Sequence, residues 1–566
     1  MAFQLSPGVN VSEIDLTTVV PSVISSTGAY AGTFNWGPAQ KIIQVDSEKT
    51  LYNMFTPANP DSNSAISFFT SSSFLAYGND LRIVRAVGAN SKNSDSNTSV
   101  TNVQVANEDV FQASYMLTNN ANTYGPFMAK YPGAIGNSLK VSLCDDPTAF
   151  TSWTYKGYFS SAPGTSEYVS NAGGGQDELH VVVVDEDGLF TGVAGTVLET
   201  YPFLSKASDA VNNGAPSYYK QAIFDNSNYI YAIDPPDYAN TSSTWGNTAA
   251  GTTYARLAST FTTSLAGGTD EVPNDAKLQQ AWDLFANKEA VEVSLLLTGN
   301  YSIALQQYVI DNVANARKDC VAFISPPYSA VVNQGGGEAD NITTWLTSLA
   351  RSSSYVVADS GWKYMYDKYN ATYRWIPLNA DVAGLCAYTD TIRDPWWSPA
   401  GFNRGNIKNA IKLAWSPSKT YRDTIYNAGV NPVCSFPGNG IVLFGDKTLQ
   451  AKPSAFDRIN VRRLFITLEK AIAKAAQYSL FEFNDDFTRA QFVALVTPFL
   501  REVQGRRGIY DFRVVCDTTN NTGFVIDSNQ FVGDIYIKPA RSINFIQLNF
   551  VAVGTSVDFT TIVGQF

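Results

Sequence analysis

The sequence contains a single histidine, His180, among 566 residues. Nucleophilic mechanisms of the Ser-His-Asp or Cys-His type need a histidine as base, and no G-x-S-x-G elbow accompanies this one. His180 lies at the head of an apolar run, so we expect it to be structural. The sequence also lacks CxxC, HExxH, GKT and GKS patterns, which argues against a zinc site and against an ATP-driven motor.

Charge and cysteine are scarce as well. Charged residues make up 16% of the chain, against about a quarter in an average protein, so polar uncharged side chains must cover much of the surface. The cysteines are odd in number and widely spaced, and we expect reduced, mostly buried thiols in a protein made in a cytoplasm. They are Cys144, Cys320, Cys386, Cys434 and Cys516. No apolar run is long enough for a membrane-spanning helix, and the first residues do not resemble a secretory signal.

Two short motifs invite a ligand interpretation that their spacing does not support. The acidic run at 185–188 lacks the carboxylate spacing of an EF-hand loop, and we expect a hairpin turn there. The triple glycine at 335–337 precedes a helical pattern but lacks the Lys-Ser/Thr of a P-loop, which favours a simple loop. We therefore expect no catalytic, metal or cofactor site.

The length predicts about three or four domains. Residues 88–270 contain 7 Lys/Arg and 17 Asp/Glu, which accounts for nearly all of the net charge of −11. Turn-forming residues and apolar runs such as 181–184 predict a mainly β structure for this stretch. An acidic, turn-rich segment of this kind favours an exposed insertion, although an ordinary soluble domain would have the same composition.

Hydrophobic patterns predict mixed α/β structure on either side of that stretch. Strands at 291–297 and 320–324 flank a helix at 303–317, which is a βαβ unit, and a helix at 342–350 and a strand at 355–358 extend it. Residues 81–87 predict a strand with its arginines on one face. The longest helical pattern covers residues 461–480.

Both ends of the chain predict strands. Val9 and Val11 alternate after a Pro-Gly turn, and residues 543–550 and 556–563 are rich in Val, Ile, Thr and Phe. A terminal strand without a hairpin partner can close its own sheet or add to the sheet edge of a neighbour. Alternation alone does not decide between these two possibilities.

Several segments resemble signatures of contractile phage tail sheath proteins. They are LSPGV at 5–9, PWWSPAGFNRG at 395–405, YNAGVNP at 426–432, GIVLFGDKTL at 440–449 and INVRRL at 459–464 with FEFND at 481–485. Phe444 stands where the family usually has tryptophan. The resemblance covers residues 1–30 and about 360–566, and residues 88–270 match no signature.

The resemblance implies an α+β, mixed α/β multidomain fold, with an α/β core built from N- and C-terminal segments and β-rich inserted outer domains. The expected domains are a strand-exchange arm at 1–20, a middle α/β domain at 21–90 and 271–359, an exposed insertion at 91–270, and a sheath core domain at 360–566 that ends in a second arm. It also implies that both terminal strands add to sheets of neighbouring subunits. The expected strand-exchange residues are Val9, Val11, Ile14, Val557, Phe559 and Ile562.

The helix at 461–480 has an apolar face and, opposite it, three cations, Arg463, Lys470 and Lys474. These cations could be a solvated stripe, or they could face an acidic tail tube. We state the second interpretation as the expectation to be tested.

The implied function is mechanical and not enzymatic. Stacked hexameric rings would form a six-start helix around the tail tube protein, bind baseplate and tail terminator proteins, and contract to drive the tube through the host envelope. We expect assembly in the host cytoplasm, residence in the virion tail, no cofactor, no nucleic-acid partner and no membrane insertion. The alternatives are a receptor- or glycan-binding tail adhesin and a glycan-cleaving enzyme with paired carboxylates.

Overall fold

A computed structural model describes residues 23–56, 63–97, 103–116, 124–237, 243–544 and 546–547. The chain divides into two compact units, residues 1–480 and residues 481–566, which are treated separately below. In the described ranges, no helix is long and apolar enough to cross a membrane.

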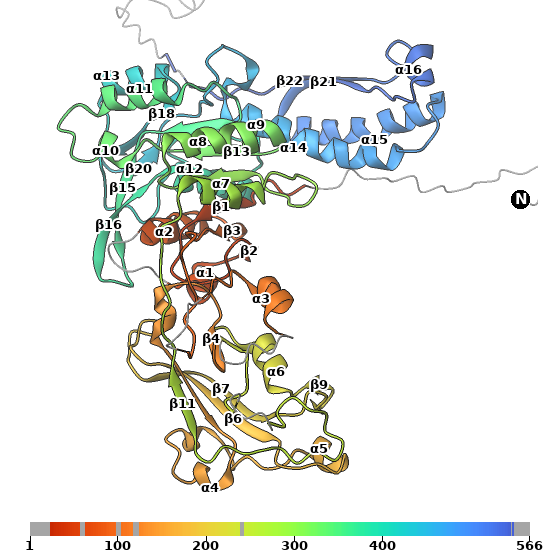
Figure 1. Cartoon of the computed structure of the whole chain (residues 1–566). Helices are drawn as coiled ribbons and strands as arrows, with labels where there is room; N and C mark the ends of the chain where they lie inside the picture. The colour runs from red at the N-terminus through yellow and green to blue at the C-terminus, as the bar shows by residue number, and fades with distance from the viewer. Residues whose placement is uncertain are drawn as a thin grey trace, which may run out of the picture. The chain divides into compact units, whose positions relative to one another are not determined.

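A sheet of seven described strands lies at the centre of the first unit (Figure 1). Its order is β18-β14-β13-β12-β1-β3-β2, and all neighbours run parallel except β2 and β3. The strands are β1 (Gly28–Gly32), β2 (Ile42–Val45), β3 (Leu81–Arg85), β12 (Leu295–Leu297), β13 (Val321–Ile324), β14 (Val356–Asp359) and β18 (Val430–Asn431). Every residue of β1, β13 and β14 is buried, which shows that both faces of the sheet are covered.

Helices from distant parts of the chain cover this sheet. They are α1 (Glu48–Phe55), α2 (Asn63–Leu75), α7 (Asp275–Asp283), α8 (Ile303–Tyr308) with its continuation through α9 (Asn315–Arg317), α10 (Tyr328–Val331), α11 (Glu338–Leu349), α12 (Asn379–Ile392), α13 (Lys419–Asn427) and α14 (Ile459–Ala476). α2 and α12 pack against each other and against the strands. The predicted βαβ unit is confirmed, with β12 and β13 parallel on either side of the helix at 303–317.

Residues 103–116, 124–237 and 243–264 form the β-rich insertion that the sequence predicted. Its main sheet is antiparallel in the order β11-β5-β6-β7. The elements are α3 (Glu108–Ser114), β4 (Phe127–Ala129), β5 (Leu139–Cys144), α4 (Pro147–Phe150), α5 (Glu167–Asn171), β6 (Glu178–Asp185), β7 (Thr196–Ser205), β8 (Val211–Asn212), β9 (Ala215–Pro216), α6 (Tyr219–Asn226), β10 (Ile230–Ala232) and β11 (Phe261–Ser264). The acidic run at 185–188 does begin a hairpin connection, where the buried Asp185 carboxylate accepts hydrogen bonds from the backbone N–H groups of Phe190 and Thr191.

Two small antiparallel ribbons complete the first unit. One joins β15 (Trp362–Asp367) with β16 (Thr372–Pro377) and β17 (Lys412–Leu413), and the other joins β19 (Val433–Phe436) with β20 (Gly440–Leu443). β20 lies in the signature segment at 440–449, and β19 follows the segment at 426–432.

The prediction that the arginines of the strand at 81–87 share one face is wrong. Arg82 and Arg85 are three positions apart, and because side chains alternate along a strand they point to opposite faces. Arg82 is half-buried beside Asp80, whereas the Arg85 guanidinium is buried and donates to four backbone carbonyls.

The second unit consists of α15 (Asp486–Gly505), β21 (Ile509–Val515), α16 (Gly523–Asp527) and β22 (Asp534–Pro539). β21 and β22 form an antiparallel hairpin, and β21 packs on α15. α15 has more residues than α14, so the prediction that 461–480 is the longest helix is wrong. α15 contains Pro498 and its apolar residues are spread around the helix, so its sequence lacks a clear helical pattern.

Candidate functional site: the root of the N-terminal arm

The six predicted strand-exchange residues, Val9, Val11, Ile14, Val557, Phe559 and Ile562, lie outside the described residues. The structure does describe residues 23–27, which lie between the expected N-terminal arm at 1–20 and β1. We call residues 23–27 the arm root. If the N-terminal arm pairs with a neighbouring subunit, the arm root is the segment that connects the arm to its own subunit.

Arg463 of α14 fastens the arm root to the body. Its guanidinium forms a two-pronged ion pair with Asp390 of α12, with N–O distances of 2.6 and 2.9 Å. The same guanidinium donates to the Ser25 carbonyl at 3.2 Å, and the Ser25 hydroxyl donates to Asp390 at 2.6 Å. Burial alone would lower the pKa of Arg463, but Asp390 outweighs that effect and holds the pKa above its ordinary value. Arg463 is therefore a permanently charged clamp.

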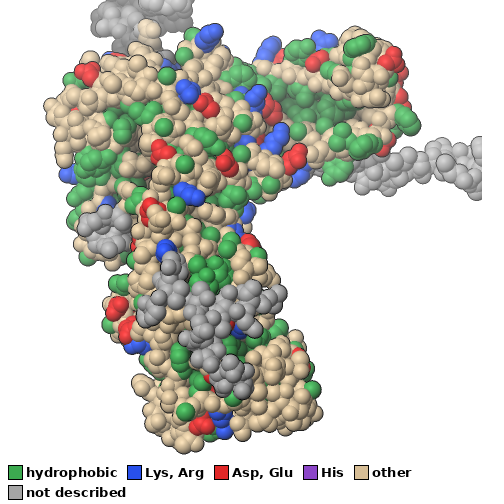
Figure 2. Space-filling model, in the orientation of Figure 1, with side chains coloured by type: hydrophobic (Ala, Val, Ile, Leu, Met, Phe, Trp, Pro, Cys, Tyr) green, Lys and Arg blue, Asp and Glu red, His purple; other side chains and the backbone are tan. Residues whose placement is uncertain are grey.

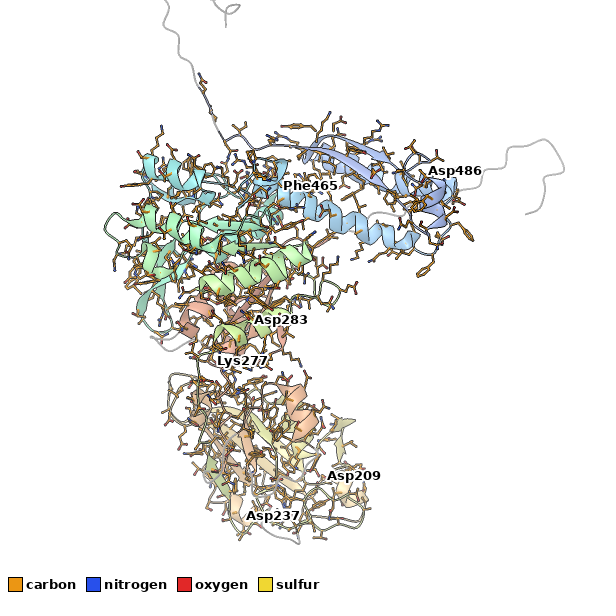
Figure 3. The ribbon with its side chains drawn as sticks, turned by 45° about the horizontal axis from the view of Figure 1, so that its top comes forward. Asp209, Asp237, Lys277, Asp283, Phe465 and Asp486 are labelled. Carbon is orange, nitrogen blue, oxygen red and sulfur yellow. The ribbon has the colours of Figure 1, made fainter. Side chains whose placement is uncertain are left out.

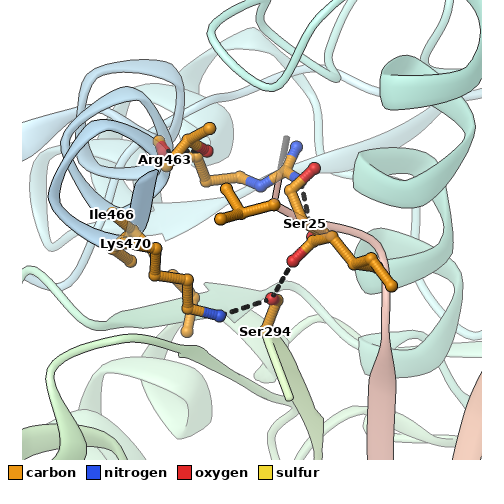
Figure 4. A pocket seen from close by; sticks show the side chains of 9 residues that line it. Ser25, Ser294, Arg463, Ile466 and Lys470 are labelled. Atoms are coloured by element: carbon orange, nitrogen blue, oxygen red, sulfur yellow. Dashed lines mark hydrogen bonds between the residues drawn. The ribbon is translucent and has the colours of Figure 1, made fainter. Parts of the chain in front are cut away.

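Lys470, two turns further along α14, makes a second attachment (Figure 4). Its ammonium donates to the Ser294 hydroxyl at 2.9 Å and to the Val293 carbonyl at 3.2 Å. Ser294 in turn donates to the Ile24 carbonyl at 3.2 Å. Burial lowers the pKa of Lys470, and the neighbouring Asp319 carboxylate opposes this. The arm root is thus held by hydrogen bonds to two consecutive backbone carbonyls, those of Ile24 and Ser25.

A small cavity lies between the arm root and α14 and is lined by Ile24, Ser25, Ser294, Arg463 and Lys470, among others. Its volume of about 10 Å³ is at most that of one water molecule. The polar groups there bind one another, which leaves no room for a substrate or cofactor. The site is therefore a structural attachment.

These contacts correct one expectation about α14. Arg463 and Lys470 do not belong to an exposed basic stripe, since their side chains are 4% and 12% exposed. The opposite face of an amphipathic helix is solvated only if nothing packs there, and here α12 and the arm root cover it. Lys474, one turn beyond Lys470, is exposed. Whether α14 contacts a tube stays a prediction.

The signature segments converge on Asp446, at the end of the GIVLFGDKTL segment. Its buried carboxylate accepts hydrogen bonds from Ser398 at 3.1 Å, Arg458 at 3.2 Å and Tyr426 at 3.4 Å. Ser398 and Tyr426 come from two other signature segments, 395–405 and 426–432, and Arg458 precedes α14 directly. These three segments therefore meet at one packed cluster that positions the start of α14.

The histidine, the cysteines and a buried aspartate, which are residue types common in enzyme active sites, are all buried here. His180 is buried, with Nδ1 accepting from the Phe203 N–H and the ring stacked 4.3 Å from Phe159, as expected for a structural histidine. Asp359, at the carboxyl end of β14, is also buried, and its carboxylate accepts from Ser325. The five cysteines are buried and unpaired, as expected. Among the described residues, no group of acidic, His or Cys side chains could hold a metal ion.

An α/β body, a β-rich insertion and a small helix–hairpin unit define a multidomain protein of mixed α/β architecture. Comparison with known proteins makes this specific. Residues 274–449 match the phage tail sheath protein central domain, and residues 451–552 match the phage tail sheath C-terminal domain. The tail sheath proteins of Vibrio phage KVP40 and Enterobacteria phage T4 are each 33% identical to the chain; both alignments cover 99% of this chain, and they cover 100% and 99% of the relatives.

This chain belongs to the phage tail sheath protein family. A solved sheath complex from an extracellular contractile injection system, in its contracted state, has the same fold with a TM-score of 0.51 at 13% identity, covering 97% of this chain and 98% of the other. The predicted family and the mixed α/β multidomain fold are confirmed. The protein is a structural subunit of a contractile tail sheath and a component of the virion tail. Both of these relatives are named tail sheath proteins, which is the function expected from the signature segments and not the adhesin or enzyme alternative.

Proposed function

We propose that copies of this chain stack as hexameric rings in a six-start helix around a tail tube, linked by terminal strands that add to the sheets of neighbours. Contraction of this sleeve would drive the tube through the host envelope for genome ejection. The tube, baseplate and tail terminator proteins would be its partners, and assembly would take place in the host cytoplasm. No nucleotide is needed, because new contacts between subunits would supply the free energy.

The observation that carries this proposal is the incomplete sheet of the second unit. Among the described residues, β21 pairs only with β22, so both outer edges of the hairpin lack a neighbouring strand. A two-stranded hairpin is marginal by itself, and added strands would stabilise it. Val493, Leu495 and Phe499 of α15 are only partly buried, which leaves apolar surface for added strands to cover. Figure 2 shows apolar side chains on the surface of this unit.

The arm root supports the same proposal from the donor side. A terminal strand that links subunits must transmit force to its own body, and a charged clamp at the base of the arm meets that need. The clamp lies on α14, and residues 477–485 connect α14 to the second unit. One helix would therefore anchor both the donated strand and the unit that receives strands from other copies.

Deleting residues 1–22 tests the proposal. The truncated chain retains the arm root and the seven described strands of the central sheet, so it should fold with the circular dichroism and melting temperature of the full chain. It should remain monomeric in sedimentation, whereas the full chain should form hollow tubes visible by negative-stain microscopy. A matched control replaces residues 1–22 with a Gly/Ser segment of equal length. Long tubes from either variant would contradict strand donation by the N-terminal arm.

A further inference from the structure

Three phenylalanines form an exposed cluster on the first unit, and two of them, Phe402 and Phe444, lie in signature segments. Phe402 lies 5.3 Å from Phe436 and 5.8 Å from Phe444, measured between ring centroids, and Phe436 lies 5.1 Å from Phe444. Phe402 is 47% exposed and Phe444 is 41% exposed. Mutually packed rings that remain this exposed in a single copy are typical of contact surfaces.

Arg422 lies against this cluster, and Arg404, in the same loop as Phe402, lies against Trp397. The Arg422 guanidinium is 5.7 Å from the ring centroids of both Phe436 and Phe444. Arg404 lies 5.4 Å from the ring centroid of Trp397. Neither arginine has a carboxylate within 4.0 Å among the described residues. We call Trp397, Phe402, Arg404, Arg422, Phe436 and Phe444 the arginine–aromatic surface.

Backbone hydrogen bonds hold this surface in a fixed shape. The Gly401 N–H donates to the Leu443 carbonyl at 2.9 Å, and the Leu443 N–H donates to the Gly405 carbonyl at 2.8 Å. A Cβ on Gly405 would lie 2.8 Å from backbone atoms of Gly401 in the same loop and 3.0 Å from the Leu443 carbonyl oxygen of β20, so only glycine permits this packing. Trp, Phe and Arg side chains on a rigid support lose little entropy on binding, which is the composition of binding hot spots.

The charge distribution identifies the partner. Residues 393–458 contain nine Lys/Arg and four Asp/Glu, and two of those acids, Asp394 and Asp446, are buried. The segment carries a formal charge of +5. Because the whole chain has a net charge of −11, the rest of the chain carries −16. Acidic side chains are spread over both units, among them Asp209, Asp237, Asp283 and Asp486 (Figure 3). A second copy of this chain therefore offers exposed acidic side chains, Asp209, Asp283 and Asp486 among them, to the arginine–aromatic surface.

We propose that the arginine–aromatic surface is a contact between copies, which docks on an acidic face of a second copy of this chain. This inference rests on the proposed function, because it assumes that the chain polymerises. A basic surface that meets a different, acidic surface makes a heterologous contact, and heterologous contacts that do not close generate helical filaments. The arms would link subunits, and this surface would fix the position of each body against its neighbour.

The test uses the full-length chain with Lys419→Glu and Arg422→Glu, and separately with Phe402→Ser and Phe444→Ser. Lys419 lies one turn before Arg422 on α13 and is exposed. We expect both double variants to retain the wild-type melting temperature and to form tubes at least about tenfold more slowly at low salt. Tube growth by the wild type should slow as salt is added. The matched control is Lys156→Glu with Tyr158→Ser, exposed residues of the insertion, and it should assemble like the wild type.

Photo-crosslinking identifies the partner directly. A benzophenone amino acid at position 444 of the full chain should give covalent dimers in assembled tubes, joined to an acidic segment of a second copy. Normal tube growth by both folded double variants would overturn the inference. So would crosslinks confined to the same copy, to added tube protein or to added nucleic acid. If the wild type itself forms no tubes, the proposed function fails, which is a different result from normal tubes of the variants.

Discussion

Single residues stabilise this chain mainly where segments far apart in the sequence meet. Arg463 and Asp390 are 73 positions apart, and Arg463 and Ser25 are 438 positions apart. A buried ion pair contributes little net stability compared with an apolar pair. Removal of one partner is nevertheless destabilising, because it leaves the other charge buried in the protein interior without a counter-charge. The clamp therefore specifies where the arm root lies.

We expect Asp390→Ala to lower the free energy of unfolding by about 3 kcal/mol, because Arg463 would remain buried without its carboxylate. The double variant Arg463→Leu with Asp390→Leu should lose less than the sum of the two single changes. Denaturant unfolding followed by circular dichroism measures both. Glu502→Ala removes an exposed ion pair with Arg506 and should change stability by less than about 0.5 kcal/mol. Equal stability of Asp390→Ala and wild type would contradict the clamp.

Asp359 makes stability depend on pH. Burial raises the pKa of this carboxyl to about 8; the hydrogen bonds from Ser325 and Gly361 oppose the increase, and the charge of Asp381 adds to it. Above about pH 4 the unfolded chain releases this proton while the folded chain retains it up to about pH 8. This group therefore lowers stability as pH rises through that window, by up to about 1.4 kcal/mol per pH unit.

Asp359→Asn should remove that dependence, because the amide resembles the protonated acid and does not titrate. The stability of the variant relative to wild type should increase from pH 4 to pH 8. Melting temperatures across this range measure the difference, with the exposed Asp423→Asn as control. Parallel curves for Asp359→Asn and wild type would show that Asp359 does not retain its proton on folding.

At the scale of elements, α14 shows what helical periodicity can and cannot predict. The helix and its apolar face agree with the pattern, since Val461, Leu464 and Leu468 are buried. The environment of the opposite face differs along the helix. It is enclosed at Arg463 and Lys470, whereas Lys474 near the end of the helix is exposed. A tube contact by α14 is therefore best tested at Lys474, because changes at Arg463 or Lys470 would disturb the body.

We expect Lys474→Glu to weaken decoration of purified tail tubes at low salt and to leave the circular dichroism spectrum unchanged. The difference from wild type should disappear at high salt, where exposed charges are screened within a few ångströms. Co-sedimentation with tubes over a salt series measures it, and Lys452→Glu, exposed and outside α14, is the control. Undiminished decoration by Lys474→Glu at low salt would contradict the tube-facing assignment.

At the scale of the whole molecule, the insertion is fastened to the α/β body by buried side chains. Trp36, which follows β1, packs in the core of the insertion, 5.3 Å from Tyr131 and 5.1 Å from Phe190 between ring centroids. Arg85 of β3 donates to the Pro132 carbonyl at 2.7 Å. The insertion is therefore joined to the body by packing as well as by its two chain crossings.

Trp36→Ala should lower stability by about 3–5 kcal/mol, because it leaves a large cavity in the contact between the insertion and the body. The insertion should then unfold separately, giving two calorimetric transitions and early proteolysis near residues 88–92 and 270–274. Trp153→Ala is the control, since Trp153 is buried wholly within the insertion. A single transition and wild-type protease resistance for Trp36→Ala would contradict the coupling.

The sequence by itself determined the family, the βαβ unit, the β-rich insertion, the buried cysteines and the structural role of His180. These follow from local motifs and periodicity, because signature segments and hydrophobic patterns are readable over a few consecutive residues. The domain boundaries and the strand-exchange residues remain predictions.

Only the tertiary structure decided which groups surround each charge. Periodicity placed Arg463 and Lys470 opposite the apolar face of a helix, but it could not show that Asp390, Ser25 and Ser294 cover that face. Neither could it show that Trp36 belongs to the core of the insertion, or that phenylalanines from three segments meet beside Arg422. The physical reason is that burial and ion pairing depend on contacts between residues tens to hundreds of positions apart, and one sequence carries no local signal for such contacts.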